Sequence, residues 1–155
     1  MVARRLPSVT NDLLPLFERD VDKLIAELEL FESESALWSV VAGVSNAAGN
    51  LALHVVGNLN QYIGARLGGA DDVRDRPAEF ASRDLPRADL IAQLKTTKAM
   101  LNTVLSELGA RRLEEPYPEA VLGYAMTTRY FLIHLYGHLN YHLGQVNYLR
   151  RVLHG

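Results

Sequence analysis

YFLIHLYGHLNYHLGQVNYLRR, residues 130–151, places two histidines, His138 and His142, four residues apart in an apolar background. Residues four apart in a helix lie one turn apart on the same face, so these two imidazoles can share one metal ion. A third ligand must come from elsewhere in the chain. His54 is the only histidine outside the last 22 residues, and Asn50 and Asn58 stand one helical turn on either side of it. We therefore expect His54, His138 and His142 to form a three-histidine site for one divalent ion.

Four segments of the chain show the three- and four-residue spacing of apolar side chains that is typical of amphipathic helices. In the first, this face holds Phe17, Val21, Leu24, Ile25 and Leu28. The second is expected to start at a cap on Asn46 and to stop at Gly68 and Gly69. The predicted helices cover residues 10–30, 46–67, 87–108 and 127–153.

Four such helices are best buried as a bundle, so the predicted fold is all-α, a four-helix bundle with a long connection between helices two and three. Antiparallel neighbours are expected, although the long connection also permits a crossover. That connection, residues 68–86, holds eight charged residues and two prolines, and loops of this length are usually functional. A short irregular or single-turn piece is expected at residues 31–38, carrying Trp38 toward the core.

Length and composition restrict the class of protein. The chain has 155 residues, which suits one domain spanning 1–155, and a net charge of -2 offers no basic field for nucleic acid or anionic lipid. It has no cysteine, so a metal must be held by imidazole, carboxylate or water. No run of about 18 apolar residues occurs, and the first 20 residues lack a signal-peptide core. We expect a cytoplasmic protein with no membrane contact.

The positions of the acidic residues exclude two familiar metal sites. All 18 Asp and Glu residues fall outside both 46–67 and 120–155. A ferritin-like di-metal bundle requires inward glutamates on its helices, which these segments lack. A zinc-protease helix requires Glu after its first histidine, whereas Leu139 follows His138.

Three neutral imidazoles would leave a bound divalent ion with its full charge and with open coordination positions. Such a centre is catalytic in type, because structural zinc sites usually fill all four positions with protein ligands. It could lower the pKa of bound water to about 7, bind a thiolate or polarise a carbonyl. Imidazole ligation suits zinc or nickel, our first expectations, and also iron or copper.

The remaining histidines receive simpler interpretations. His134 drifts round the helix and is expected to pack or to support a ligand, and His154 near the carboxyl terminus is expected to be solvated. A competing interpretation makes every histidine an ordinary buried polar residue, each with its own hydrogen-bond partner. We rank this interpretation last.

At these residues the chain resembles the DinB/YfiT-like superfamily of bacterial four-helix-bundle proteins. The matching pieces are the segment around His54, residues 49–61, and the His138-Leu-Asn-Tyr-His142-Leu-Gly144-Gln145 sequence. The segment Asp75-Arg-Pro-Ala-Glu-Phe80 is similar to one branch of that superfamily.

The resemblance implies that His54, His138 and His142 are the metal ligands, that Gly144 permits close helix contact and that Gln145 lies near the site. It also implies a homodimer. Members of the superfamily include transferases and isomerases that use low-molecular-weight bacterial thiols, so a thiol is an implied cofactor. In those transferases the nucleophile belongs to the cofactor, so the absence of cysteine is no objection.

Several polar residues are candidates for an outer shell, because metal-bound histidines usually donate their second N–H to a polar partner. Arg74 and Arg76 could hold an anionic substrate, but pairing with neighbouring acids in the same connection is favoured. The outer-shell candidates are Asn50, Asn58, Gln61, Tyr141 and Gln145, and the acids are Asp71, Asp72, Asp75 and Glu79.

Two functions therefore remain open. The first is a metal-dependent enzyme, either a thiol S-transferase or a hydrolase-like protein, that acts on a small molecule at the open metal position. The alternative is a non-catalytic, metal-binding or dimerising helical module. If the connection 68–86 folds over the metal and encloses a pocket, the enzyme is favoured; a metal open to bulk solvent on a flat surface favours the module.

Overall fold

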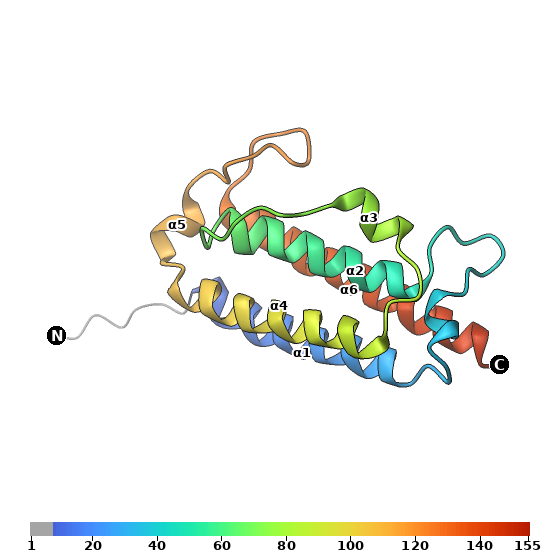
Figure 1. The fold of residues 1–155 in the computed structure, drawn as a ribbon. Helices are drawn as coiled ribbons and strands as arrows, with labels where there is room; N and C mark the ends of the chain where they lie inside the picture. The colour runs from blue at the N-terminus through green and yellow to red at the C-terminus, as the bar shows by residue number, and fades with distance from the viewer. Residues whose placement is uncertain (1–7) are drawn as a thin grey trace.

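The computed structural model describes residues 8–155 and contains four long helices (Figure 1). The expectation about a signal peptide therefore falls partly on residues 1–7, which lie outside the described residues. The long helices are α1 (Val9–Glu29), α2 (Ala48–Leu59) with its π-helical continuation η2 (Asn60–Ala65), α4 (Arg87–Glu107) and α6 (Thr128–Leu153). The short helices are η1 (Ser35–Trp38), α3 (Arg76–Ala81) and α5 (Ala110–Glu114).

The predicted all-α four-helix bundle is confirmed. Within residues 8–155 the structure has no strand, and its one β-type contact is an isolated antiparallel bridge between Pro116 and Thr127. No described helix is long and apolar enough to cross a membrane.

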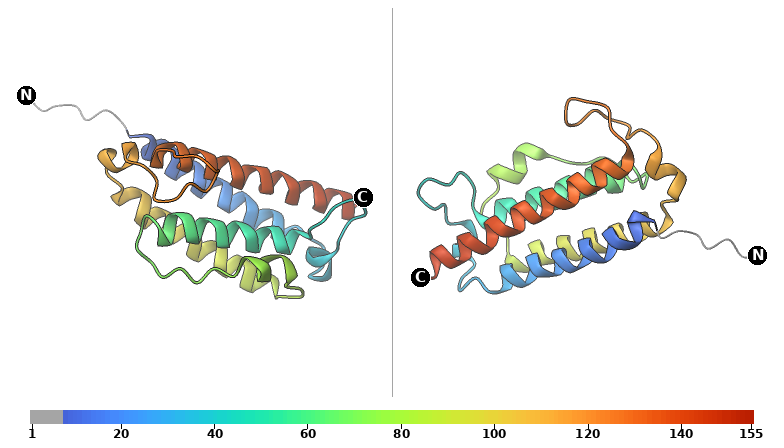
Figure 2. Two further views of the ribbon diagram at one scale, coloured as in Figure 1. Left: turned by 90° about the horizontal axis from the view of Figure 1, so that it is seen from above. Right: turned by 180° about the vertical axis from the view of Figure 1, so that it is seen from behind.

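The topology is a crossover. Helices α4 and α6 each pack against both α1 and α2. Figures 1 and 2 show that α2 and α4 run in one direction while α1 and α6 run in the other. The expectation of antiparallel neighbours is thus wrong for the pairs α2–α4 and α1–α6, because the connection between η2 and α4 returns along the length of the bundle. The same arrangement makes α2 and α6 antiparallel neighbours, which brings together the two helices that carry His54, His138 and His142.

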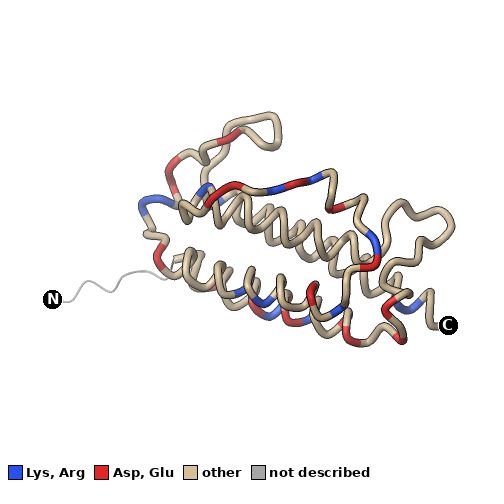
Figure 3. Tube along the Cα trace, in the orientation of Figure 1, with Lys and Arg blue, Asp and Glu red and all other residues tan. Residues whose placement is uncertain are grey.

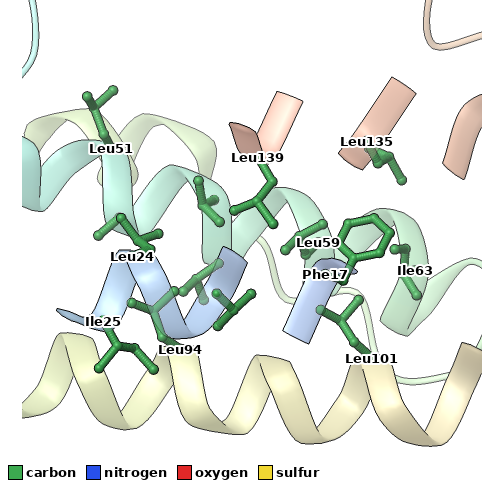
Figure 4. Close-up of a cluster of buried hydrophobic side chains, with 14 of the residues drawn as sticks. Phe17, Leu24, Ile25, Leu51, Leu59, Ile63, Leu94, Leu101, Leu135 and Leu139 are labelled. Atoms are coloured by element: carbon green, nitrogen blue, oxygen red, sulfur yellow. The ribbon is translucent and has the colours of Figure 1, made fainter. Parts of the chain in front are cut away.

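The core lies between the four long helices, and each contributes leucines to it. Figure 4 shows Leu24, Leu59, Leu94 and Leu139, from α1, α2, α4 and α6, meeting in one cluster with Phe17. Burying each such side chain contributes about 1.5–3 kcal/mol. All five residues predicted for the apolar face of α1 are buried.

Helices α2 and α6, which carry the three histidines, have few charged residues. Figure 3 shows Lys, Arg, Asp and Glu gathered on α1, α4 and the connection before α3. Helix α2 carries none, and α6 carries only Arg129, Arg150 and Arg151. Charge near the histidines must therefore come from another segment.

The second helix differs from its prediction at both ends. Its cap is Ala47 with no side-chain hydrogen bond, so Asn46 does not cap it. The helix also changes to π geometry at Asn60, where the Arg66 N–H bonds to the Gln61 carbonyl. The helical hydrogen bonds bypass the Tyr62 carbonyl at this point. It accepts a hydrogen bond from the Tyr117 hydroxyl at 2.7 Å instead. π-helical turns are rare and often accompany functional sites, and periodicity gives no signal for them.

The connection between η2 and α4 is ordered by α3, which the sequence pattern did not predict. Asp75 caps α3 by accepting from the Ala78 N–H at 3.0 Å. Trp38, buried as expected, donates its indole N–H to the Leu85 carbonyl at 3.2 Å and ties the end of this connection to the bundle. A Cβ on Gly49 would lie 2.8 Å from the Trp38 ring, so glycine is required there.

A buried carboxylate joins α1 to α6. Asp20 is fully buried and accepts hydrogen bonds from Arg19 Nε at 2.7 Å and from the Tyr136 hydroxyl at 2.7 Å. Burial alone would raise the pKa of Asp20, but these hydrogen bonds hold it well below its ordinary value. A carboxylate with a lowered folded-state pKa stabilises the protein above its ordinary pKa, and this stabilisation is lost progressively as the pH falls below it.

We expect Asp20→Asn to lower the free energy of unfolding at pH 7 by about 1.5–3 kcal/mol, since hydrogen bonds to a buried charge are lost. The variant should also lose less stability than the wild type below about pH 4. Urea unfolding at pH 7 and pH 3.5 measures both. The exposed Asp22, which pairs with Lys98 at 2.7 Å, gives a control variant, Asp22→Asn, expected to cost less than about 1 kcal/mol. Equal losses in the two variants at pH 7 would contradict a special role for Asp20.

Candidate metal centre

The three predicted histidines meet at the contact between α2 and α6. His54 lies in the middle of α2, and His138 and His142 lie one turn apart on α6. The Nε2 atom of His138 is 3.1 Å from Nε2 of His54 and 3.1 Å from Nε2 of His142. One ring nitrogen from each residue lies within 4.8 Å of the others, so the cluster could hold a metal ion. The rings stand nearly perpendicular to one another, at 71° to 89°.

Hydrogen bonding at the far side of two rings fixes which nitrogen carries the proton. His54 Nδ1 lies 3.0 Å from Glu79 Oε1, and His142 Nδ1 lies 2.7 Å from Gln145 Oε1. Both oxygens are acceptors as assigned, so both Nδ1 atoms donate and both Nε2 atoms present lone pairs to His138. The single Nε2 proton that His138 can carry satisfies only one of these contacts.

This donor set fits a divalent cation. If the three residues were ordinary buried histidines, the single His138 Nε2 proton would leave one of the other two Nε2 lone pairs without a donor at 3.1 Å, which is unfavourable. Metal–nitrogen bonds of about 2.0–2.1 Å in tetrahedral geometry place ligand nitrogens slightly more than 3 Å apart, close to the observed spacing. The interpretation of the histidines as unrelated buried polar groups is therefore disfavoured.

The cluster also keeps its α6 rings neutral, as metal ligands must be. Burial, with smaller contributions from His142 and His54, lowers the pKa of His138 to about 3. Burial likewise lowers the pKa of His142, although the hydrogen bond with Gln145 opposes it. At neutral pH both rings therefore present lone pairs without first losing a proton.

Glu79 contacts the cluster, and sequence reasoning missed this contact. Its side chain, on α3, is 7% exposed and receives Arg74 Nε at 2.8 Å and Nη2 at 2.9 Å as well as His54 Nδ1. Burial raises the pKa of Glu79, but Arg74 and His54 outweigh it and hold the pKa below its ordinary value. Arg74 Nη2 also lies 3.3 Å from His54 Nδ1, but both nitrogens donate to the same oxygen, so this approach is not a hydrogen bond.

The sequence did contain a signal for this contact. Glu79 stands four residues after the Asp75 cap and belongs to the segment similar to one branch of the superfamily. We expected it to pair with an arginine, and the pairing with Arg74 is observed. Its second contact, to the back of His54, forms the carboxylate–histidine arrangement that orients metal ligands and raises their basicity.

Gly57 makes the approach of Glu79 possible. It lies on α2 three residues after His54, and a Cβ built on it would stand 2.1 Å from Glu79 Oε2. Any side chain at this position would push the carboxylate away from the helix. Gly57 thus allows α3 to lie close against α2.

The other outer-shell candidates divide into three groups. Gln145 contacts His142 directly, while Tyr141 is exposed with its ring 5.2 Å from that of His142. Asn50 and Gln61 form no hydrogen bond with an imidazole of the described residues. Asn50 donates to two carbonyls of the α3 region, and Gln61 accepts from Arg74 at 2.8 Å. Asn58 is buried, and its Oδ1 has no hydrogen-bond partner among the described residues.

Of the expectations for His134, His154 and Gly144, only the first agrees with the structure. His134 packs as expected, with its ring stacked on Phe131 at 5.7 Å. His154 is not solvated: its side chain is 13% exposed and its Nδ1 lies 3.4 Å from Glu32 Oε2, because the end of α6 turns against the start of the η1 connection. Gly144 makes no close helix contact, since a Cβ there would have nothing within 4 Å.

Fold and site together define a helical bundle with a three-histidine cluster that could hold a metal ion. The chain belongs to the DinB superfamily, whose family model matches residues 16–146. Its fold is similar to that of a conserved protein from Enterococcus faecalis, with a TM-score of 0.73 and 17% sequence identity over 96% of this chain and 98% of that one. The sequence matches none of the curated proteins with which it was compared.

We expect protein purified without an affinity tag to carry close to one divalent ion per chain, because the three imidazoles converge on one point. His138→Ala and His142→Ala should each abolish stoichiometric binding at neutral pH, as measured by elemental analysis after dialysis. His134→Ala provides the matched control, because this exposed histidine on the same helix lies outside the cluster. Full metal content in both ligand variants would contradict the assignment.

Gly57→Ala tests the role of Glu79 without altering a ligand. The added methyl should displace the carboxylate and weaken metal affinity about 10–100-fold, the usual cost of losing an outer-shell partner. Competition with a chromophoric chelator measures the affinity. Gly137→Ala is the control, since a Cβ there meets nothing within 4 Å on α6. Unchanged affinity in Gly57→Ala would show that Glu79 does not support the ligand.

Proposed function

We propose that this protein is a metal-dependent enzyme of the thiol S-transferase type, working at the three-histidine centre. One observation carries the proposal: His54 and His138 line a surface hollow of about 180 Å³, so the cluster faces a space that a small molecule can enter. A structural site would instead fill its coordination with protein ligands.

The connection between η2 and α4 also favours the enzyme over the non-catalytic module, which would leave its site flat and open to solvent. Phe80, on α3, lies against the His54 ring with a centroid distance of 4.9 Å. Arg74 and Arg76 from the same connection line the hollow. The segment therefore covers one side of the cluster and forms a wall of the hollow.

The distribution of carboxylates favours thiol transfer over hydrolysis. A bound divalent ion would lower the pKa of a coordinated thiol or water. Hydrolysis also benefits from a free general base. No Asp or Glu of residues 8–155 lines the hollow, and Glu79 is already held by Arg74 and His54, so no free carboxylate is placed to act as that base.

A thiol needs less assistance from the protein. In the proposed transfer, the thiol proton passes to solvent and the sulfur forms a bond to an electrophilic carbon. The leaving group departs from that carbon with its bonding electron pair. His54, His138 and His142 would hold the ion, and Arg74 would keep Glu79 in place behind His54.

The open position can be tested with cobalt-substituted protein. Titration with 2-mercaptoethanol should change the visible absorption spectrum and produce a thiolate-to-metal band that saturates at one thiol per cobalt. His54→Ala protein should show neither response. If thiol, carboxylate and azide all leave the wild-type spectrum unchanged, the ion is closed to substrate and the non-catalytic module becomes the better account.

A second candidate, the dimerising module, is favoured by one surface. The outer side of α6 exposes large apolar residues and two glycines along about 33 Å of helix, with no charge among them. We name it the α6 face; it comprises Tyr130, Ile133, Gly137, Tyr141, Gly144, Tyr148 and Val152. Uncharged apolar surfaces of this extent mark interaction sites. We propose a second copy as occupant, because an uncharged strip satisfies the self-complementarity that a two-fold interface requires.

Light scattering should then give the mass of two chains for the wild type and of one chain for Tyr148→Glu, which places a charge in the α6 face. Leu30→Glu alters an exposed leucine outside that face and should leave the mass unchanged. A monomeric wild type would exclude the dimer.

A further inference from the structure

The hollow beside the three histidines has two polar groups, on Asn58 and Arg76, that form no hydrogen bond or ion pair within residues 8–155. Its volume of about 180 Å³ corresponds to about six water molecules, which suits a small organic molecule. Besides His54, His134 and His138, its lining includes Asn58, Arg74, Arg76, Val121, Phe131 and Leu135.

Asn58 is the first unused group. It follows His54 by one helical turn, so both side chains lie on the same face of α2. Asn58 is 7% exposed, and its Oδ1 is buried without a partner among residues 8–155. Leaving a buried polar atom unpaired costs about 1–3 kcal/mol, so such atoms require an explanation. Since no partner fixes Oδ1, the amide can turn its NH₂ group toward a ligand in the hollow.

Arg76 is the second unused group. Its guanidinium lies 5.4 Å from the centre of the Phe80 ring, and within the described chain it forms no ion pair. Our expectation that Arg76 pairs with a neighbouring acid is therefore wrong. Arg74, in contrast, is engaged with Glu79 and Gln61. No acid of the described residues lines the hollow, so the charge of the exposed Arg76 side chain is available to a ligand there.

The other side of the hollow is apolar. Phe131 and Leu135 are buried residues of α6, and Val121 belongs to the loop before that helix. A ligand seated here would contact a hydrocarbon wall, a cationic and amide pair, and the open side of the histidine cluster. A ligand that contacts all three needs an apolar part, an anionic part and a part that binds the ion.

We infer that the hollow binds a small organic carboxylate with a second, metal-seeking group, whose carboxylate is held by Arg76 and the Asn58 amide. This inference rests on the proposed function, because the second group occupies the open position of the ion. It names the substrate class: a short aliphatic carboxylic acid that carries a thiol. A planar guanidinium and an amide N–H together suit the two oxygens of a carboxylate.

The test compares two thiols on the cobalt protein: 3-mercaptopropionate, which carries a carboxylate, and 2-mercaptoethanol, which does not. The wild type should bind 3-mercaptopropionate about tenfold more tightly, because charge-assisted hydrogen bonds are added. Arg76→Gln should remove this preference and leave the affinity for 2-mercaptoethanol within about twofold. Arg112→Gln, an exposed arginine on α5, gives the same change in net charge and should keep the preference.

Asn58→Leu separates recognition from structure. The variant should bind 3-mercaptopropionate more weakly while its melting temperature stays level or rises, because the leucine removes a buried Oδ1 that has no partner among the described residues. A lower melting temperature would assign Asn58 a structural role and contradict its part in the inference.

Three outcomes would overturn the inference, and they are distinguishable. Equal affinity of the wild type for both thiols would remove the carboxylate from the substrate class while leaving the open metal position intact. Equal weakening of both thiols by Arg76→Gln would show that the arginine acts only on the site as a whole. No spectral response to either thiol would overturn the proposed function and the inference with it.

Discussion

The buried contact of Glu79 with Arg74 and His54 is the interaction on which the site depends. It joins three segments: α3, the stretch before α3, and the middle of α2. A buried carboxylate is stable only when it is paired and hydrogen-bonded, and removing one partner of such a pair typically costs about 3–5 kcal/mol. The charge is supplied by the connection because α2 and α6 carry no acids, so the position of α3 controls the orientation of His54.

This dependence explains several features that otherwise look unrelated. Gly57 leaves room for the carboxylate, and Asn50 holds the end of α3 by binding the Glu79 and Ser82 carbonyls. The Asp75 cap sets the start of α3. Each of these residues acts on the position of α3, and only through it on the imidazole. The long, charged connection is thus a structural part of the site.

The sequence predicted those features that repeat and missed those that occur once. Periodicity identified all four long helices and placed α1 within a residue of its observed ends. The signal is strong because every turn of a helix with one buried face repeats the same apolar spacing. The pairing of His138 with His142 followed from helical spacing, and His54 followed from elimination. The π-helical turn at Asn60, the α3 helix and the contact from Glu79 to His54 depend on tertiary packing. No short-range pattern specifies them.

The crossover topology separates the ligands widely along the chain. His54 and His138 are 84 residues apart, and η2, α3, α4 and α5 lie between them in the chain. Closing a loop of that length has an entropic cost that the helix contacts must already have offset, so the cluster exists only when α2 and α6 are packed. Binding that is specific for the folded state shifts the unfolding equilibrium by mass action. An ion held at the cluster would therefore add its binding free energy to the stability of the contact between α2 and α6, and would act as a non-covalent cross-link between two distant parts of the chain.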